Sequence, residues 1–127
     1  MNRRGFTLIE LLIVVVIIGI LAAIAIPKFA NTKQKSYIAT MKSDLKNLST
    51  AQEAYYYDNG IYYAGAIPNA AFDYGPSAGV TVNLLSGDIS GWSGTAQYAG
   101  IANTCAIFVG SHAAPPPAIQ EGSPACN

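Results

Sequence analysis

The chain has 127 residues, enough for one domain, and its seven basic and seven acidic side chains give no formal net charge at pH 7. From Phe6 onward five lysines stand against seven acidic residues, and this balance gives no support for nucleic-acid binding.

An apolar run from Phe6 to Ile26 contains a single ionisable side chain, Glu10. As a helix, its 21 residues would extend about 30 Å, the thickness of the hydrocarbon core of a bilayer. The short basic segment 1–5 ahead of it is expected to stay in the cytoplasm by the positive-inside rule. The lysines just beyond the run outnumber the two arginines of that segment and leave the orientation open; they are Lys28, Lys33 and Lys35.

Glu10 is costly in such a run, because a carboxylate at the centre of a membrane helix costs roughly 2.5 to 3.5 kcal/mol on insertion scales, and less near an end. We expect a partner of opposite charge on another copy of the chain. The alternative is a carboxylate that reaches the lipid headgroups from the helix end.

The segment from Arg3 to Leu12, RRGFTLIELL, is followed by a Val/Ile run, Gly19 and Pro27. This pattern closely resembles the N-terminus of type IV pilins and type II secretion pseudopilins over about the first third of the chain. The resemblance implies that residues 1–5 are a leader, cut after Gly5 by a prepilin peptidase on the cytoplasmic face.

The same resemblance implies that Phe6 becomes an N-methylated N-terminus and that Glu10 meets the Phe6 amino group of a neighbouring subunit. Pairing would offset the cost of burying the carboxylate and the amine in an apolar environment, and it would set the axial register between neighbouring helices. In similar pilins the stretch between a Gly such as Gly19 and a Pro such as Pro27 loses helical structure on assembly. A simple bend at Pro27 is the other expectation.

An alternative treats the run as an ordinary secretory signal with an A-x-A-like cleavage site at residues 23–25, which would leave a secreted soluble binding module. The run is longer than the usual 7 to 15 residues, Glu10 lies inside it, and the helical pattern continues past Pro27. These features favour the membrane helix.

Residues 27–57 are predicted to continue that helix as an amphipathic one, so the whole helix covers residues 6–57. Asp58, Asn59 and Gly60 form a strong stop signal. The expected inner stripe consists of Tyr37, Ile38, Met41, Leu45, Leu48, Ala51, Gln52 and Tyr55, with Asp44 among the polar residues on the other faces.

Residues 58–127 are expected to form a small head of turn-rich sequence. After an irregular connection over 61–79, three strands are predicted at 80–85, 93–99 and 104–109. Short turns favour an antiparallel meander that packs on the helix. The predicted fold class is α+β, a long N-terminal helix against a small antiparallel sheet.

A head of about 65 residues has a marginal core. Cys105 and Cys126 are the two cysteines, so one intramolecular disulfide is possible, and it is predicted to tie the C-terminal tail to the sheet. An oxidised pair places the head outside the cytoplasm. The chain is therefore expected in the inner membrane as a single-pass precursor and then in an extracellular filament.

No catalytic, cofactor or metal site is predicted. His112 is the one histidine that could act as a base, but no acid is placed to orient it, and no metal-ligand spacing is present. The four acidic residues in turn-like sequence are expected to be solvated, namely Asp58, Asp73, Asp88 and Glu121.

Within the family that the chain resembles, a pilus subunit and a secretion pseudopilin both remain possible. Major pseudopilins have an acid-rich calcium loop near the C-terminus, whereas residues 111–127 contain only Glu121, which favours a pilus subunit. The partners implied are other copies in a helical filament, the prepilin peptidase, and an inner-membrane platform with its ATPase. Adhesion, twitching, DNA uptake and secretion all stay open, and the aromatic residues give no support for electron conduction.

Overall fold

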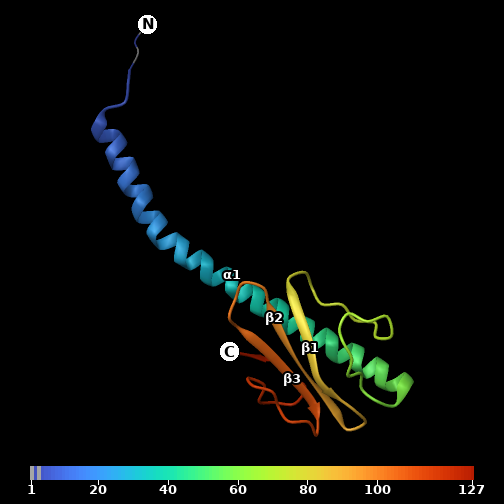
Figure 1. Ribbon diagram of the computed structural model, residues 1–127. Helices are drawn as coiled ribbons and strands as arrows, with labels where there is room; N and C mark the ends of the chain where they lie inside the picture. The colour runs from blue at the N-terminus through green and yellow to red at the C-terminus, as the bar shows by residue number, and fades with distance from the viewer. Residues whose placement is uncertain (1, 3) are drawn as a thin grey trace. The chain divides into compact units, whose positions relative to one another are not determined.

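The computed structural model describes residue 2 and residues 4–127, so Met1 and Arg3 of the expected leader lie outside the described residues. One helix and one sheet are formed (Figure 1). The elements are α1 (Leu8–Asn59), β1 (Val80–Gly87), β2 (Gly91–Tyr98), β3 (Thr104–Gly110) and β4 (Ala125–Cys126). Two compact units make up the chain, one ending at Lys35 and the other beginning at Ser36.

In the first unit, α1 runs through Gly19 and Pro27 without interruption. The helix is long and apolar enough to cross a membrane. It begins at Leu8 and not at Phe6 as predicted, because Thr7 is the capping residue that precedes the first helical turn.

The other end of α1 also lies two residues beyond the predicted Tyr57. The helix ends at Asn59, and Gly60 follows in the left-handed conformation with a φ of 72°. The Gly60 N–H donates to the carbonyl of Tyr56 at 2.8 Å, as expected for a glycine that closes a helix. The predicted stop signal is confirmed, but the turn residues Asp58 and Asn59 belong to the last helical turn.

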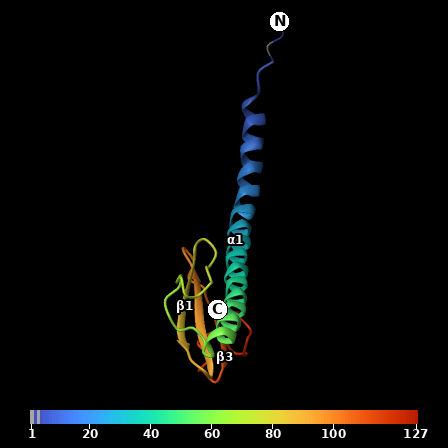
Figure 2. The same ribbon diagram turned by 90° about the vertical axis from the view of Figure 1, so that its right-hand side faces the viewer.

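In the second unit, the four strands form one antiparallel sheet in the order β1-β2-β3-β4. Figure 2 shows this sheet lying along one side of the C-terminal half of α1. The predicted meander is confirmed, with β1 and β2 longer toward their shared turn than the sequence suggested. The two-residue β4 was not predicted, because a strand this short has no alternating pattern.

The predicted disulfide is confirmed: Cys105 in β3 is bonded to Cys126 in β4, and the two residues face each other across the sheet. Further main-chain bonds hold the same tail. Gly122 N–H donates to the carbonyl of Phe108 at 2.8 Å. The C-terminal segment is therefore part of the sheet edge and not a free tail.

The core lies between α1 and the sheet. The helix contributes the fully buried side chains of Met41, Leu45 and Leu48, as the apolar stripe predicted. The sheet contributes Val82, Trp92, Ala96 and Ile107 among others.

Asp44 corrects the prediction, because this residue was expected on a polar face and is only 4% exposed. Its two carboxylate oxygens accept hydrogen bonds from the Ser77 N–H at 2.9 Å and the Ser77 hydroxyl at 2.8 Å. The Tyr74 hydroxyl donates to the Asp44 carbonyl at 2.9 Å, and burial raises the pKa of this phenol. A buried carboxylate is tolerated here because both oxygens are hydrogen-bonded.

Candidate functional site: the N-terminal end of the helix

The residues expected to control processing and assembly lie together at the start of α1. Arg4, Gly5, Phe6 and Glu10 line one shallow hollow of the surface. The Phe6 side chain is 88% exposed. The Gly5–Phe6 bond, which is expected to be cut, thus lies on the same surface as the Glu10 carboxylate. That carboxylate is expected to be needed after cleavage.

Within this uncut chain the Glu10 carboxylate is bound by Thr7. Its Oε2 atom accepts hydrogen bonds from both the Thr7 N–H and the Thr7 hydroxyl, each at 2.8 Å. In return the Glu10 N–H donates to the Thr7 Oγ1 at 3.3 Å. This reciprocal pattern is a capping box, in which two free N–H groups of the first turn are satisfied by side chains.

The capping role of Thr7 was not among the sequence-based predictions. The signal was present, since Thr7-Leu8-Ile9-Glu10 has the T-x-x-E spacing that precedes an apolar helix. The structure shows Glu10 bound within its own chain, and its expected role between chains stays a prediction. In the uncut chain the Phe6 nitrogen is an uncharged amide, so the expected ion pair requires cleavage.

Between Glu10 and Ile26 the surface of α1 is apolar and uncovered. Every large aliphatic side chain from Leu8 to Ile26 is at least half exposed. Leu8, Leu12 and Val16 contribute to one shallow groove on this surface. A soluble monomer rarely exposes so long an apolar surface, so this helix needs lipid or other helices around it.

Gly19 and Pro27 lie within this helix at the positions expected to be its weak points. A Cβ atom added to Gly19 would meet nothing within 4 Å. Packing within the chain therefore gives no reason for a glycine there, whereas close approach of another helix would. Pro27 lacks the N–H that would donate to the carbonyl one turn earlier, so α1 is weaker at this point.

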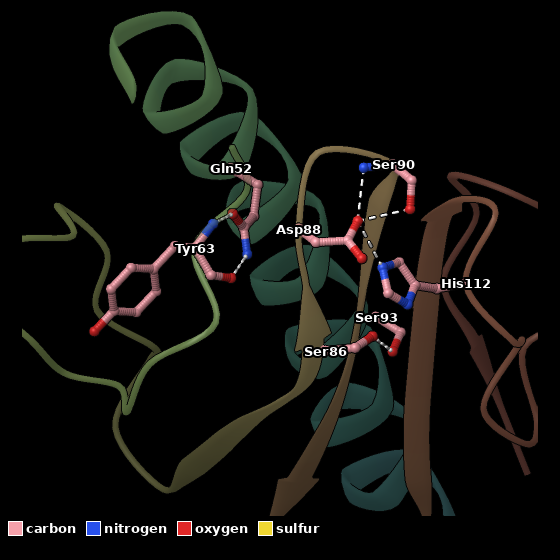
Figure 3. Close-up of polar contacts among 7 residues, drawn as sticks. All are labelled: Gln52, Tyr63, Ser86, Asp88, Ser90, Ser93 and His112. Atoms are coloured by element: carbon pink, nitrogen blue, oxygen red, sulfur yellow. Dashed lines mark hydrogen bonds and ion pairs between the residues drawn. The ribbon is translucent and has the colours of Figure 1, made fainter. Parts of the chain in front are cut away.

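In the head, Asp88 lies in the turn between β1 and β2, and its side chain makes three polar contacts (Figure 3). Its Oδ1 accepts from the N–H and the hydroxyl of Ser90, each at 2.6 Å. These hydrogen bonds lower the pKa of Asp88 to about 2. His112 Nε2 lies 3.2 Å from the same oxygen, within ion-pair range, although the angle is not that of a hydrogen bond.

These three residues are not arranged for nucleophilic catalysis. The Ser90 hydroxyl donates to Asp88, and His112 approaches the same carboxylate, so the histidine is not placed to take a proton from the serine. Among the residues that the structure describes, no group of three or more His, Cys, Asp or Glu side chains could hold a metal ion. Asp88 instead connects the β1–β2 turn to the start of the C-terminal segment.

Comparison with known proteins gives a family-model match and several similar relatives. Residues 1–26 match the family model described as the prokaryotic N-terminal methylation motif. The chain is similar to the type IV major pilin protein PilA of Myxococcus xanthus, with 46% identity over 89 residues, 68% of this chain and 40% of that protein.

Two further relatives are similar over shorter stretches. The type II secretion system core protein G of Pseudomonas aeruginosa is 42% identical over 65 residues, 49% of this chain and 46% of that protein. The type IV major fimbrial protein FimA of Dichelobacter nodosus is 53% identical over 51 residues, 40% of this chain and 33% of that protein. The chain thus spans less than half the length of each of these relatives.

Proposed function

Since this chain belongs to the family of type IV pilins and type II secretion pseudopilins, whose members are structural proteins and not enzymes, we propose that it is a structural subunit of a type IV pilus-like filament. Cleavage after Gly5 and N-methylation of Phe6 precede assembly. The subunits then polymerise through the N-terminal part of α1.

One observation carries this proposal: α1 exposes an apolar surface from Leu8 to Ile26 whose single ionisable side chain, Glu10, lies close to the expected new N-terminus. In the membrane, lipid covers that surface. In a filament, the same surface of other subunits replaces the lipid, and the helix leaves the bilayer without being exposed to water.

Cleavage changes the electrostatics of the site. It converts the Phe6 amide into a cationic amine, and Glu10 is the one anion nearby in the apolar segment. In a low-dielectric environment both charges are costly alone and are stabilised as a pair. Pairing between neighbouring subunits requires Glu10 to leave the Thr7 capping box or to share its oxygens with it.

The proposed route follows from this chemistry. The precursor is inserted in the inner membrane with residues 1–5 in the cytoplasm and the disulfide-bonded head outside. A prepilin peptidase cuts and methylates the chain, and an inner-membrane platform with its ATPase moves it into the filament. The proposed partners are therefore the processing and assembly proteins and other copies of the chain.

A type II secretion pseudopilin is the second candidate, favoured by the 42% identity to the core protein G of Pseudomonas aeruginosa. Against it, residues 111–127 contain one acidic side chain, Glu121, whose Oε1 accepts from the Gly110 N–H at 2.6 Å. An acid-rich calcium loop is not built from this segment. The secreted binding module is disfavoured because the methylation-motif match extends through Ile26.

Mass spectrometry of the mature N-terminus, combined with electron microscopy of the cell surface, tests the proposal. A methylated Phe6 in surface filaments is the expected result. A mature chain that begins at Ile26 would overturn it in favour of a cleaved signal peptide. A methylated Phe6 in a chain confined to the cell envelope, together with a secretion defect on deletion, would favour the pseudopilin.

A further inference from the structure

Charge is unevenly distributed along this chain. Residues 28–46 contain five lysines and one buried aspartate, a net charge of +4, whereas residues 47–127 contain five acidic side chains and no lysine or arginine. The chain is thus basic over the middle of α1 and acidic beyond it. Two copies displaced along the helix axis would bring regions of opposite charge together.

The acidic side chains are not equivalent. Five of the seven accept a hydrogen bond from a donor in their own chain, whereas Asp58 and Asp73 have no hydrogen-bond or ion-pair partner among residues 4–127. The five are Glu10, Asp44, Glu53, Asp88 and Glu121, whose donors are Thr7, Ser77, Tyr62, Ser90 and the Gly110 N–H respectively.

The two unpartnered carboxylates line the same cavity, which has a volume of about 300 Å³. The last turns of α1 and the segment 71–73 form it. Ala54 and the buried Phe72 contribute apolar wall beside the two carboxylates. An apolar wall with carboxylates beside it suits a long aliphatic side chain that ends in a positive charge.

The helix end adds to the negative potential of this cavity. Asp58 lies in the last turn of α1, where free carbonyls give the helix a partial negative charge, and no basic residue lies in that turn. A carboxylate at this end is unfavourable by itself. A cation in the cavity would offset both the repulsion between Asp58 and Asp73 and the repulsion between Asp58 and the negative end of the helix.

The basic segment of the same helix is too far away to supply that cation. Lys46 is 12 residues before Asp58 on α1, roughly 18 Å along the axis at 1.5 Å per residue. Lys28, Lys35, Lys42 and Lys46 are all exposed on the helix surface. A second copy of the chain presents the same lysines at other axial positions.

We propose that the cavity formed by Asp58 and Asp73 receives a lysine from the basic segment 28–46 of a second copy, as a subunit contact separate from the Phe6–Glu10 pair. This inference rests on the proposed filament function and adds a named contact to it. Being exposed, the contact is expected to weaken as salt rises, by about fivefold for each ion pair at most.

Isotope-mixed cross-linking tests the contact directly. Light and heavy preparations of the full chain are purified in detergent, mixed at high concentration, and treated with a carbodiimide, which joins carboxylates to amines in contact. The expected products are heavy–light links from Asp58 or Asp73 to a lysine within 28–46, lost at high salt. The inference is overturned if these aspartates form no mixed links, or if exposed Glu53 links equally well.

A charge exchange provides the second test. Asp58→Lys with Asp73→Lys is expected to lower association of the full chain by at least fivefold, measured by sedimentation in the same detergent. Changing the linked lysine to Asp in the same chain should restore association. Glu53→Gln is the matched control on the same helix, and a thermal melt of each variant verifies folding.

The two proposals fail in different ways. If the unmodified chain makes no filament in cells, the filament function is wrong, and the mixed links in detergent still decide the cavity contact. If filaments form but neither the links nor the rescue is seen, the cavity contact alone is wrong. Calcium binding by calorimetry that is lost in Asp58→Asn/Asp73→Asn, without mixed links, would place an ion in the cavity and overturn the subunit contact.

Discussion

The side-chain amide of Gln52 exchanges two hydrogen bonds with the main chain of Tyr63, each 2.8 Å long (Figure 3). Gln52 is fully buried, so the amide satisfies two main-chain groups that have no strand beside them. The Tyr63 ring stacks on Phe72 with its centroid 4.5 Å away. One polar residue in the apolar stripe thereby fixes the irregular connection on the helix.

Gln52→Ala is expected to destabilise the head by about 3 kcal/mol, because both Tyr63 groups lose their partner and a cavity remains. Gln52→Glu keeps the acceptor for the Tyr63 N–H but places a buried carboxylate oxygen against the Tyr63 carbonyl, so it should also destabilise the head. Denaturant unfolding of the full chain in detergent, followed by tryptophan fluorescence, measures the change. Glu53→Gln, one residue along and exposed, is the control, and equal stability of Gln52→Ala and this control would contradict the role given to Gln52.

Thr7 and Glu10 can be separated by substitution. Glu10→Ala and Glu10→Gln are both expected to leave membrane insertion intact and to abolish or strongly slow filament assembly, because neither can pair with the Phe6 amine. Thr7→Ala removes the cap, at a cost of about 1 kcal/mol to the start of α1, but keeps the charge and should still assemble. Sheared-filament yield and membrane fractionation measure the two effects. Normal filaments from Glu10→Gln would show that the charge is not needed.

The Cys105–Cys126 bond closes a loop with a sequence separation of 21 residues. Replacing both residues by Ser is expected to lower the free energy of unfolding by about 3 kcal/mol on the chain-entropy model. Thermal melts with and without reductant measure this, and the reductant should have no effect on the double variant. Alkylation of both thiols in native, unreduced protein would contradict the bond.

Asp88 is expected to make the stability of the head depend on pH in the acidic range. Its pKa falls from 3.8 in the unfolded chain to about 2 in the folded one, so its stabilising contribution is complete above about pH 4 and is lost as the pH falls toward 2. Asp88→Asn is expected to remove this part of the pH dependence. Unfolding midpoints between pH 2 and 5 provide the measurement, with Ser90→Ala expected to reduce the dependence because the Ser90 hydroxyl is the leading cause of the shift.

Pro27 is expected to weaken α1 locally, so Pro27→Ala should strengthen the segment between Gly19 and residue 27, by up to about 3 kcal/mol. Hydrogen exchange of the main-chain amides in this segment, in filaments and in detergent, measures the change in helix stability. Fast exchange in filaments of the unmodified chain and slow exchange in the variant is the expected result. Equal protection in both would leave Pro27 as a simple bend.

Features with local causes could be predicted from the sequence. The apolar run, its length and the single Glu10 indicated a membrane helix, since hydrophobicity and helical rise depend only on neighbours in the chain. The 3.6-residue period placed Met41, Leu45 and Leu48 in the core, and two cysteines allowed one disulfide. The T-x-x-E box at Thr7 is equally local, although the capping role of Thr7 was not predicted.

Only the tertiary structure decided how polar groups are used. Asp44 was expected on a polar face, and Gln52 was expected in the inner stripe without a known partner. Their hydrogen-bond partners, Ser77 and Tyr63, lie 33 and 11 residues further along the chain. Likewise nothing local joins Asp58 to Asp73, because the shared cavity exists only after the connection folds back on α1. Long-range contacts of this kind follow from where the loops close, which a period of three or four residues does not encode.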